Sequence, residues 1–169
     1  MVSKTQRLSH ERRVIEELIT GLGGLAGGQI HTGQSLENRF DVQGWNLSPH
    51  QRFQYGDLRV EHPAVRVVVE IESGGGVTNL VKYWPLLTEK RDPKRLLIVH
   101  VYRLSSKSDY IAHRRLWDYL IDRMREDLIR RCKIRWPQDW EARLFCYRDG
   151  AGVNEVVDHI RQALLAGYG

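Results

Sequence analysis

The run LLIVHVYRL (residues 96–104) places the strongest constraint on the fold, because it is apolar almost without interruption. A strand of this composition is buried on both faces, as in a sheet that helices cover on each side. A second apolar run, VRVVVEIES (residues 65–73), reads as another strand, and amphipathic segments separate and flank the two. The pattern predicts an α/β protein with a mixed central β-sheet flanked by helices.

The remaining segments are assigned by periodicity and by turn residues. We expect helices over residues 4–20, from Thr78 as N-cap to about Leu87, over 109–133 and over 153–165. We expect strands over residues 53–61, 65–73, 96–104 and 142–148, with a short strand near 39–42. Residues 62–64 join two of these strands in a hairpin.

Length and composition indicate a globular protein. The 169 residues fit one domain, and we expect a single domain over residues 1–169, with a core over about 4–103 and a helix–strand–helix extension over about 109–169. The sequence lacks an apolar run of the roughly 20 residues that cross a bilayer, and its first residues do not resemble a signal peptide. We therefore expect a cytoplasmic protein without a membrane partner.

The chain is basic, with a formal net charge of +5 and a pI near 9.4. Most of its cations are arginines, which suit bidentate contacts with phosphate. A polyanionic partner such as nucleic acid is therefore expected.

Acidic residues end the buried strand in the stretch EIESGGGVTNLVKYW (residues 70–84). Side chains two apart in a strand share a face, so Glu70 and Glu72 project together with Val68. If the hairpin is centred on Pro63 and Ala64, paired residue numbers sum to 127 and Asp57 lies opposite Glu70. Converging carboxylates repel one another, and the arrangement calls for a cation.

Oxygen ligands without a histidine or cysteine close by in the sequence favour Mg²⁺ or Mn²⁺ over zinc. Magnesium is typically held by one or two carboxylates together with water and substrate phosphate. We expect Asp57 and Glu70 to be metal ligands, and Glu72 to orient the attacking water or a second ion.

Two further charged residues are expected beside the carboxylates. Glu11 falls within the apolar stripe of the first helix, where an acid needs a partner. Lys82 lies one turn inside the helix after the glycines, and its ammonium could stabilise charge on a scissile phosphate.

Several residues are candidates for binding nucleic acid. Phosphate contacts are expected from Ser73, Gly74, Gly75, Thr78 and Asn79, since bare glycine backbone permits close approach. Lys90, Arg91, Lys94 and Arg95 could steer DNA toward the site. The five tryptophans could stack on bases, although Trp84 and Trp117 occupy positions typical of a core.

In this order, Glu11, Asp57, Glu70-Ile71-Glu72 and Lys82 resemble the PD-(D/E)xK nuclease superfamily, which has the restriction-endonuclease-like fold. The helix sequence ERRVIEELI is similar to the first helix of Holliday junction resolvase-like nucleases, which would make Glu11 an accessory acid. The resemblance covers residues 4 to about 103, and implies that the following long helix supplies a dimer face or DNA contacts.

The resemblance implies that Asp57 is the first metal-binding acid and Glu70 the second. Glu72 stands where the family has lysine, and Gly56 precedes Asp57 where the family has proline. Other members of this fold carry Glu-x-Glu or recruit a lysine from the next helix, which would make Lys82 the substitute.

The expected function is that of a magnesium-dependent, homodimeric DNA endonuclease that hydrolyses phosphodiester bonds with a metal-bound water as nucleophile. An alternative is a catalytically inactive nucleic-acid-binding module of a restriction or repair assembly. A third interpretation takes GLGGLAGG (residues 21–28) as a nucleotide-binding loop, which would require a strand before Gly21.

Overall fold

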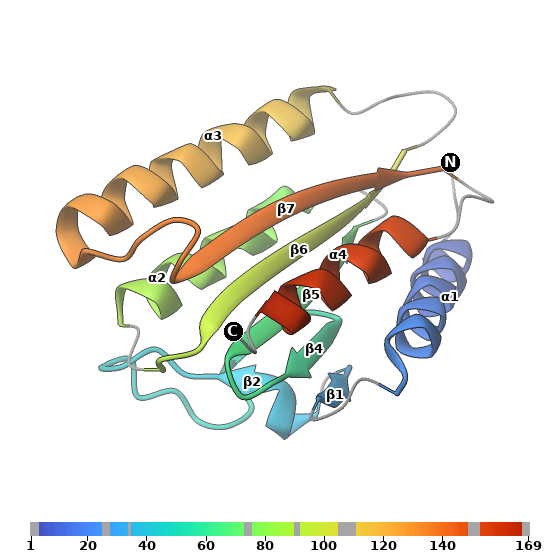
Figure 1. Ribbon diagram of the computed structural model, residues 1–169, viewed down its shortest axis with the longest axis horizontal. Helices are drawn as coiled ribbons and strands as arrows, with labels where there is room; N and C mark the ends of the chain where they lie inside the picture. Colours follow the sequence, from blue (N-terminus) through green and yellow to red (C-terminus); the bar gives the residue numbers. More distant parts are fainter. Residues whose placement is uncertain are drawn as a thin grey trace.

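The computed structural model describes residues 4–24, 28–33, 35–72, 76–89, 92–104, 111–148 and 153–166, with side chains from residue 10 onward. The molecule is an α/β protein with a five-stranded mixed sheet between helices (Figure 1). Its strands are β1 (Gln29–Thr32), β2 (Arg39–Phe40), β3 (Phe53–Gln54), β4 (Leu58–Glu61), β5 (Val65–Glu72), β6 (Arg95–Arg103) and β7 (Trp140–Tyr147). Its helices are α1 (Lys4–Leu22), α2 (Tyr83–Thr88), α3 (Ile111–Asp127) and α4 (Asn154–Ala166), with 3₁₀ helices η1 (Leu36–Asn38) and η2 (Val77–Lys82) and a π-helix η3 (Leu128–Cys132).

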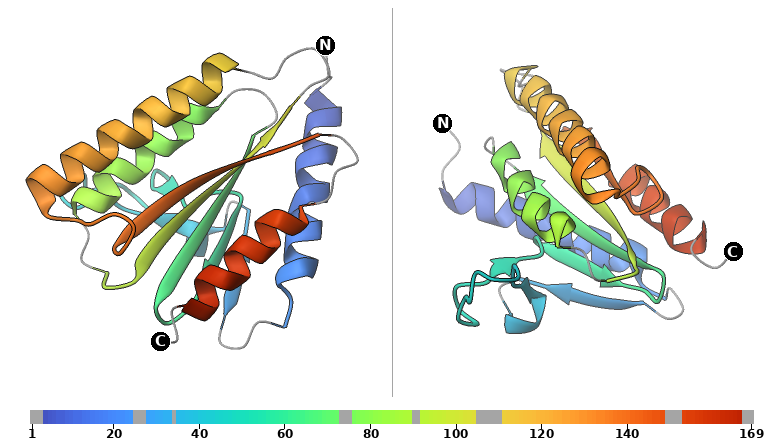
Figure 2. Two further views of the ribbon diagram at one scale, coloured as in Figure 1. Left: turned by 45° about the horizontal axis from the view of Figure 1, so that its top comes forward. Right: turned by 90° about the vertical axis from the view of Figure 1, so that its left-hand side faces the viewer.

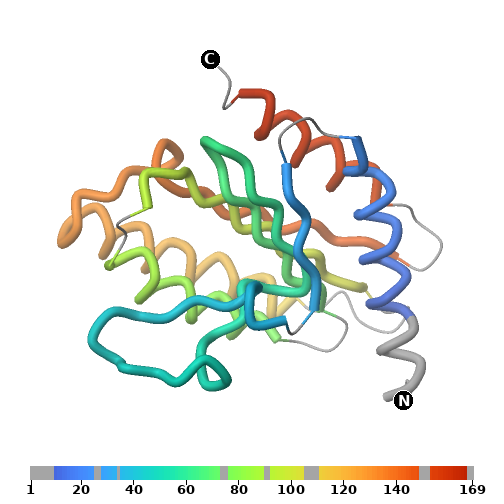
Figure 3. Tube along the Cα trace, turned by 90° about the horizontal axis from the view of Figure 1, so that it is seen from below, coloured from blue at the N-terminus to red at the C-terminus, as the bar shows by residue number. Residues whose placement is uncertain are grey.

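The large sheet has the order β1-β4-β5-β6-β7. Strands β1, β4 and β5 are antiparallel neighbours, whereas β5, β6 and β7 run parallel. Helices connect the parallel strands, because a parallel neighbour can be reached only by crossing back over the sheet. Strands β2 and β3 form a separate pair, and the segment joining them extends alongside α2 (Figure 3).

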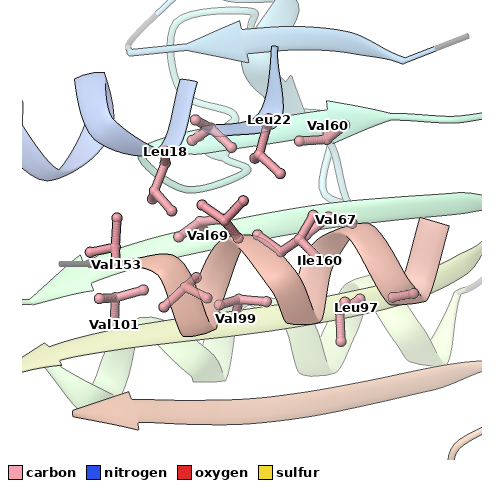
Figure 4. Packing of buried hydrophobic residues seen from close by; sticks show 14 of the residues in the cluster. Leu18, Leu22, Val60, Val67, Val69, Leu97, Val99, Val101, Val153 and Ile160 are labelled. Atoms are coloured by element: carbon pink, nitrogen blue, oxygen red, sulfur yellow. The ribbon is translucent and has the colours of Figure 1, made fainter. Parts of the chain in front are cut away.

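Helices cover both faces of the sheet, as the apolar run of β6 predicts. Figure 2 shows α1 and α4 on one face and α2 and α3 on the other. The first layer packs Leu18 and Ile160 against Val67 and Val99 (Figure 4). The second layer packs Tyr83 and other residues of η2, α2 and α3 against the opposite face.

Several expected boundaries needed correction. Thr78 does not cap a helix: η2 begins after Gly76, has no side-chain cap, and passes into α2 only at Tyr83. The predicted helix over 109–133 ends in the π-helix η3, after which Lys133 adopts a left-handed conformation. Strand β1 was not expected, because its four residues are partly or fully exposed and show no apolar run.

Helix α1 extends to Leu22, so the glycine-rich segment follows a helix. A dinucleotide-type loop must follow a strand, and this excludes the nucleotide-loop interpretation. None of the helices within the described ranges is both long and apolar enough to cross a membrane.

Candidate active site

The register of β4 and β5 brings Asp57 to Glu70. Leu58 pairs with Val69, so the paired numbers sum to 127 as the sequence predicts. Asp57 lies one position before β4, where its amide donates to the carbonyl of Val69 at 2.9 Å. The Asp57 carboxylate accepts a hydrogen bond from the Ile71 amide at 2.8 Å. The side chain is therefore held against the end of β5.

The two faces of β5 pack against different helices. Val67, Val69 and Ile71 belong to the core beneath α1 and α4, and Val68 belongs to the core beneath α2 and α3. Glu70 shares the face of Val68, as the alternation of the strand requires, and it is only 4% exposed. A carboxylate buried to this extent needs compensating partners.

The backbone conformation of Gly56 excludes a proline at the position before Asp57. Its φ is +112°, a conformation that side chains disfavour, and a Cβ there would lie 2.6 Å from the Val69 carbonyl oxygen. The same Cβ would approach a carboxylate oxygen of Glu70 to 3.4 Å. A glycine is required here for the chain to pass this close to β5.

Glu70 is held by two residues of the following helical segment. Lys82 at the end of η2 forms an ion pair with Glu70 Oε1, and its side chain is 16% exposed. The hydroxyl of Tyr83, which is fully buried, lies 2.6 Å from the same oxygen and 2.9 Å from the carbonyl oxygen of Tyr55. The Tyr83 hydroxyl has one proton, so an ionised Glu70 and the Tyr55 carbonyl compete for it, whereas a protonated Glu70 satisfies both contacts.

The pKa of Glu70 reflects this balance. The pKa of Glu70 is raised to about 7: burial raises it most, the contacts with Lys82 and Tyr83 lower it, and the nearby charge of Asp57 raises it by a smaller amount. Glu70 therefore changes protonation state near neutral pH. A group tuned in this way is a candidate for a functional role.

His100 lies directly beside Glu70 on β6, although 30 positions separate them in sequence. Its side chain is completely buried, and neither ring nitrogen has a hydrogen-bond partner among the described residues. Burial, together with the smaller effect of the charge of Lys82, lowers the pKa of His100 to about 4. The expectation that the carboxylates have no histidine nearby is therefore wrong. The parallel register of β5 and β6 places this neutral imidazole next to Glu70.

The other acids also belong to this cluster. Burial raises the pKa of Asp57, and the charge of Glu11 raises it further, while the Ile71 amide and Lys82 lower it. Burial raises the pKa of Glu72 too, with further contributions from Asp57 and Glu11. Glu11 on α1 therefore lies close enough to act on two of the acids, as its place on the apolar stripe predicts.

Glu72 is held by the segment that follows the glycines. Its carboxylate accepts hydrogen bonds from the Gly76 amide at 3.1 Å and from the side-chain amide of Asn79. A Cβ on Gly76 would lie 2.2 Å from a Glu72 oxygen, so bare backbone is needed for this approach. The Gly76 amide therefore serves to hold this carboxylate.

The remaining predicted residues lie in three places. Thr78 is exposed near Asn79 at the start of η2. Lys94 and Arg95 lie at the opposite end of β5 and β6 and form ion pairs with Glu61 and Glu141. The structure therefore does not bring Lys94 and Arg95 to the carboxylates of the candidate site. Predictions for Ser73, Gly74, Gly75, Lys90 and Arg91 fall outside the described residues.

The donor set is compatible with a hard divalent cation. Asp57 and Glu70 supply carboxylate oxygens, and the charge of Asp57 raises the pKa of both Glu70 and Glu72, a repulsion that a cation would relieve. Within the described ranges, no group of three or more His, Cys, Asp and Glu side chains is arranged to hold a metal. Magnesium needs only one or two carboxylates, since water and substrate phosphate complete its coordination.

Tyr83 and His100 are the site residues that sequence reasoning missed. The apolar context of each indicates only burial, and their approach to Glu70 depends on how η2 and β6 pack. The chain gave no significant match to any protein-family model, curated protein or solved structure.

Proposed function

We propose that the protein is a divalent-metal-dependent DNA endonuclease with a restriction-endonuclease-like fold. The observation that carries the proposal is the convergence of Asp57, Glu70 and Lys82 at one end of the sheet, with Glu72 and Glu11 close by. The mixed sheet with helices on both faces supports it, as does the overall basic charge. The sequence resemblance places the metal-binding acids at Asp57 and Glu70.

In this proposal, Asp57 and Glu70 hold Mg²⁺ or Mn²⁺. The cation, when bound, supplies Lewis-acid polarisation of the phosphate and activation of water. Lys82 contacts Glu70, and its ammonium would stabilise the negative charge that develops on the phosphate. Glu72, fixed by Gly76 and Asn79, orients the attacking water, and the buried wall formed by Tyr83 and His100 keeps bulk solvent from Glu70.

Hydrolysis joins the water oxygen to phosphorus and breaks the bond from phosphorus to the bridging oxygen. A homodimer would provide one site for each strand of a duplex. Exposed apolar residues of α3, including Ile111 and Leu116, support such a contact.

The test is cleavage of supercoiled plasmid, linear duplex, single strand and four-way junction with Mg²⁺ or Mn²⁺. Asp57→Asn and Glu70→Gln keep the size of each side chain, and we expect each to lower the cleavage rate by at least about 100-fold, since even changes behind a metal ligand cost 10–100-fold. DNA binding in EDTA should remain. The control Glu16→Gln alters an exposed acid on α1 and should cut normally. Full activity of Asp57→Asn would refute the proposal.

The catalytically inactive binding module remains the second candidate, and one feature favours it. Lys82 neutralises Glu70, and Glu72 uses its carboxylate to bind Gly76 and Asn79. This account predicts salt-sensitive DNA binding without cleavage in either metal, and binding that Asp57→Asn leaves unchanged.

A further inference from the structure

A groove of about 740 Å³ opens beside the carboxylates. Three separate parts of the chain line it: the segment between β2 and β3 with β3 itself, the η2–α2 segment, and the end of α3 with η3. Its size falls within the range of about 300–1,000 Å³ found for ligand sites. Figure 3 shows the first two segments next to one another.

The groove shares two lining residues with the candidate active site. Asn79 and Lys82 line it, and the same residues bind Glu72 and Glu70. A ligand in the groove would therefore lie against the residues that hold the acids.

Aromatic rings form much of the lining. Trp45 is 52% exposed and meets the ring of Phe53 edge to face at a centroid distance of 5.6 Å. Trp84 is partly buried, and its indole nitrogen donates to Asp127 at 3.0 Å, which fixes the orientation of the ring. These rings line the groove together, and flat rings match the faces of nucleobases.

The charged residues of the groove favour an anionic chain. Two cations, Lys82 and Arg131, line the groove with one acid, Asp127, which pairs with Arg131 at 3.4 Å. Thr78 and Asn79 add hydrogen-bonding groups. Bases stacked on aromatic rings with phosphates near cations are the usual arrangement in single-strand binding.

We propose that this groove binds an unpaired nucleotide of the substrate, so that the site acts on single-stranded DNA or next to an unpaired segment. The inference rests on the proposed nuclease function and narrows its substrate class. In duplex DNA the faces of the bases are covered by their neighbours, so Trp45 can stack only on a base that has left the helix.

The test measures binding in EDTA, where no cleavage is needed. Fluorescence anisotropy gives the dissociation constants of wild type, Trp45→Ala and Trp45→Phe for single-stranded and blunt duplex DNA. Loss of one stacked base should weaken single-strand binding by about fivefold to 150-fold, because such stacks are worth roughly 1–3 kcal/mol. Duplex binding should change less than about twofold, and Trp45→Phe should retain most of the single-strand affinity.

Leu36→Ala is the matched control, since Leu36 is similarly exposed and lies outside the groove. Circular dichroism checks that each variant is folded. Unchanged single-strand binding in Trp45→Ala, or an equal loss for both DNA forms, would overturn the inference, as would undetectable binding of single strands by wild type.

A single-stranded RNA arm distinguishes the source of the nucleotide. Stacking alone predicts a similar Trp45 effect for both polymers, whereas binding of RNA only would overturn the DNA assignment. Because binding and cleavage are measured separately, a chain that cuts DNA but shows no Trp45 effect defeats only this inference. If the protein never cuts DNA but Trp45→Ala weakens single-strand binding, the nuclease proposal is refuted and the groove remains a single-strand binding site.

Discussion

At the scale of single residues, the central feature is a buried carboxylate that accepts a hydrogen bond from a buried tyrosine hydroxyl. Glu70 faces Lys82 and Tyr83, and Asp57 and His100 lie beside it. Its pKa near 7 means that the folded protein binds a proton that the unfolded chain has released.

The stability of the protein should therefore depend on pH through Glu70. Protonation stabilises the folded state fully below the unfolded pKa of about 4.5, and this contribution is lost as the pH rises through about 7. We expect Glu70→Gln, which is always neutral, to be more stable than wild type near pH 8 by up to about 3 kcal/mol. The difference should fall toward zero near pH 4.5.

Urea unfolding across this pH range measures the difference. The control is Glu16→Gln, which changes an exposed acid that pairs with Arg12. Its stability should differ from that of wild type by a similar small amount at every pH. A gap between Glu70→Gln and wild type that stays constant with pH would contradict the assignment.

Gly56 gives a second prediction at this scale. We expect Gly56→Ala to destabilise the fold by at least about 2 kcal/mol, because it combines a disfavoured φ with a backbone collision at Val69. Thermal unfolding measures the loss. The control Gly24→Ala has a similar positive φ but open space around it, and should cost only about 1 kcal/mol. Equal losses in the two variants would show that the collision is relieved.

At the scale of elements, the sheet shows what a sequence pattern can predict. The predicted register of β4 and β5, in which paired residue numbers sum to 127, was confirmed. It could be predicted because a short hairpin fixes the register of antiparallel strands. The faces of β5 were confirmed as well, since alternation is a local property. The approach of His100 could not be predicted, because a parallel register depends on the length and packing of the crossover through η2 and α2.

Helix α1 packs closely against α4 at Gly21, where there is no room for a side chain. A Cβ on Gly21 would lie 2.7 Å from a methyl carbon of Val157. We expect Gly21→Ala to lower the free energy of unfolding by about 1 kcal/mol or more, despite the better helix propensity of alanine. In a Val157→Ala background, the same change should instead be neutral or stabilising.

A double-mutant cycle by urea unfolding measures this coupling. We expect the double variant to be more stable than the sum of the two single effects predicts. Additive effects of the two substitutions would mean that α1 and α4 do not meet at this point.

At the scale of the whole molecule, the class of fold could be predicted and the groove could not. Two apolar strands and the amphipathic segments around them were sufficient for a mixed sheet between helices. The groove joins residues 45, 84 and 131, which no local pattern connects. Its aromatic character depends on the path of the chain between β2 and β3, where turn residues predict bends but not their destination.

The pairing of α1 with α4 has a consequence for synthesis. These helices are the first and last described elements to leave the ribosome, and they share one core against the same face of the sheet. The acids, the lysine and the histidine of the site are all translated by residue 100. The helix that carries Glu11 nevertheless gains its full set of apolar neighbours only when residues 153–164 have been added. A nascent chain thus holds every residue of the site well before it can hold them in place.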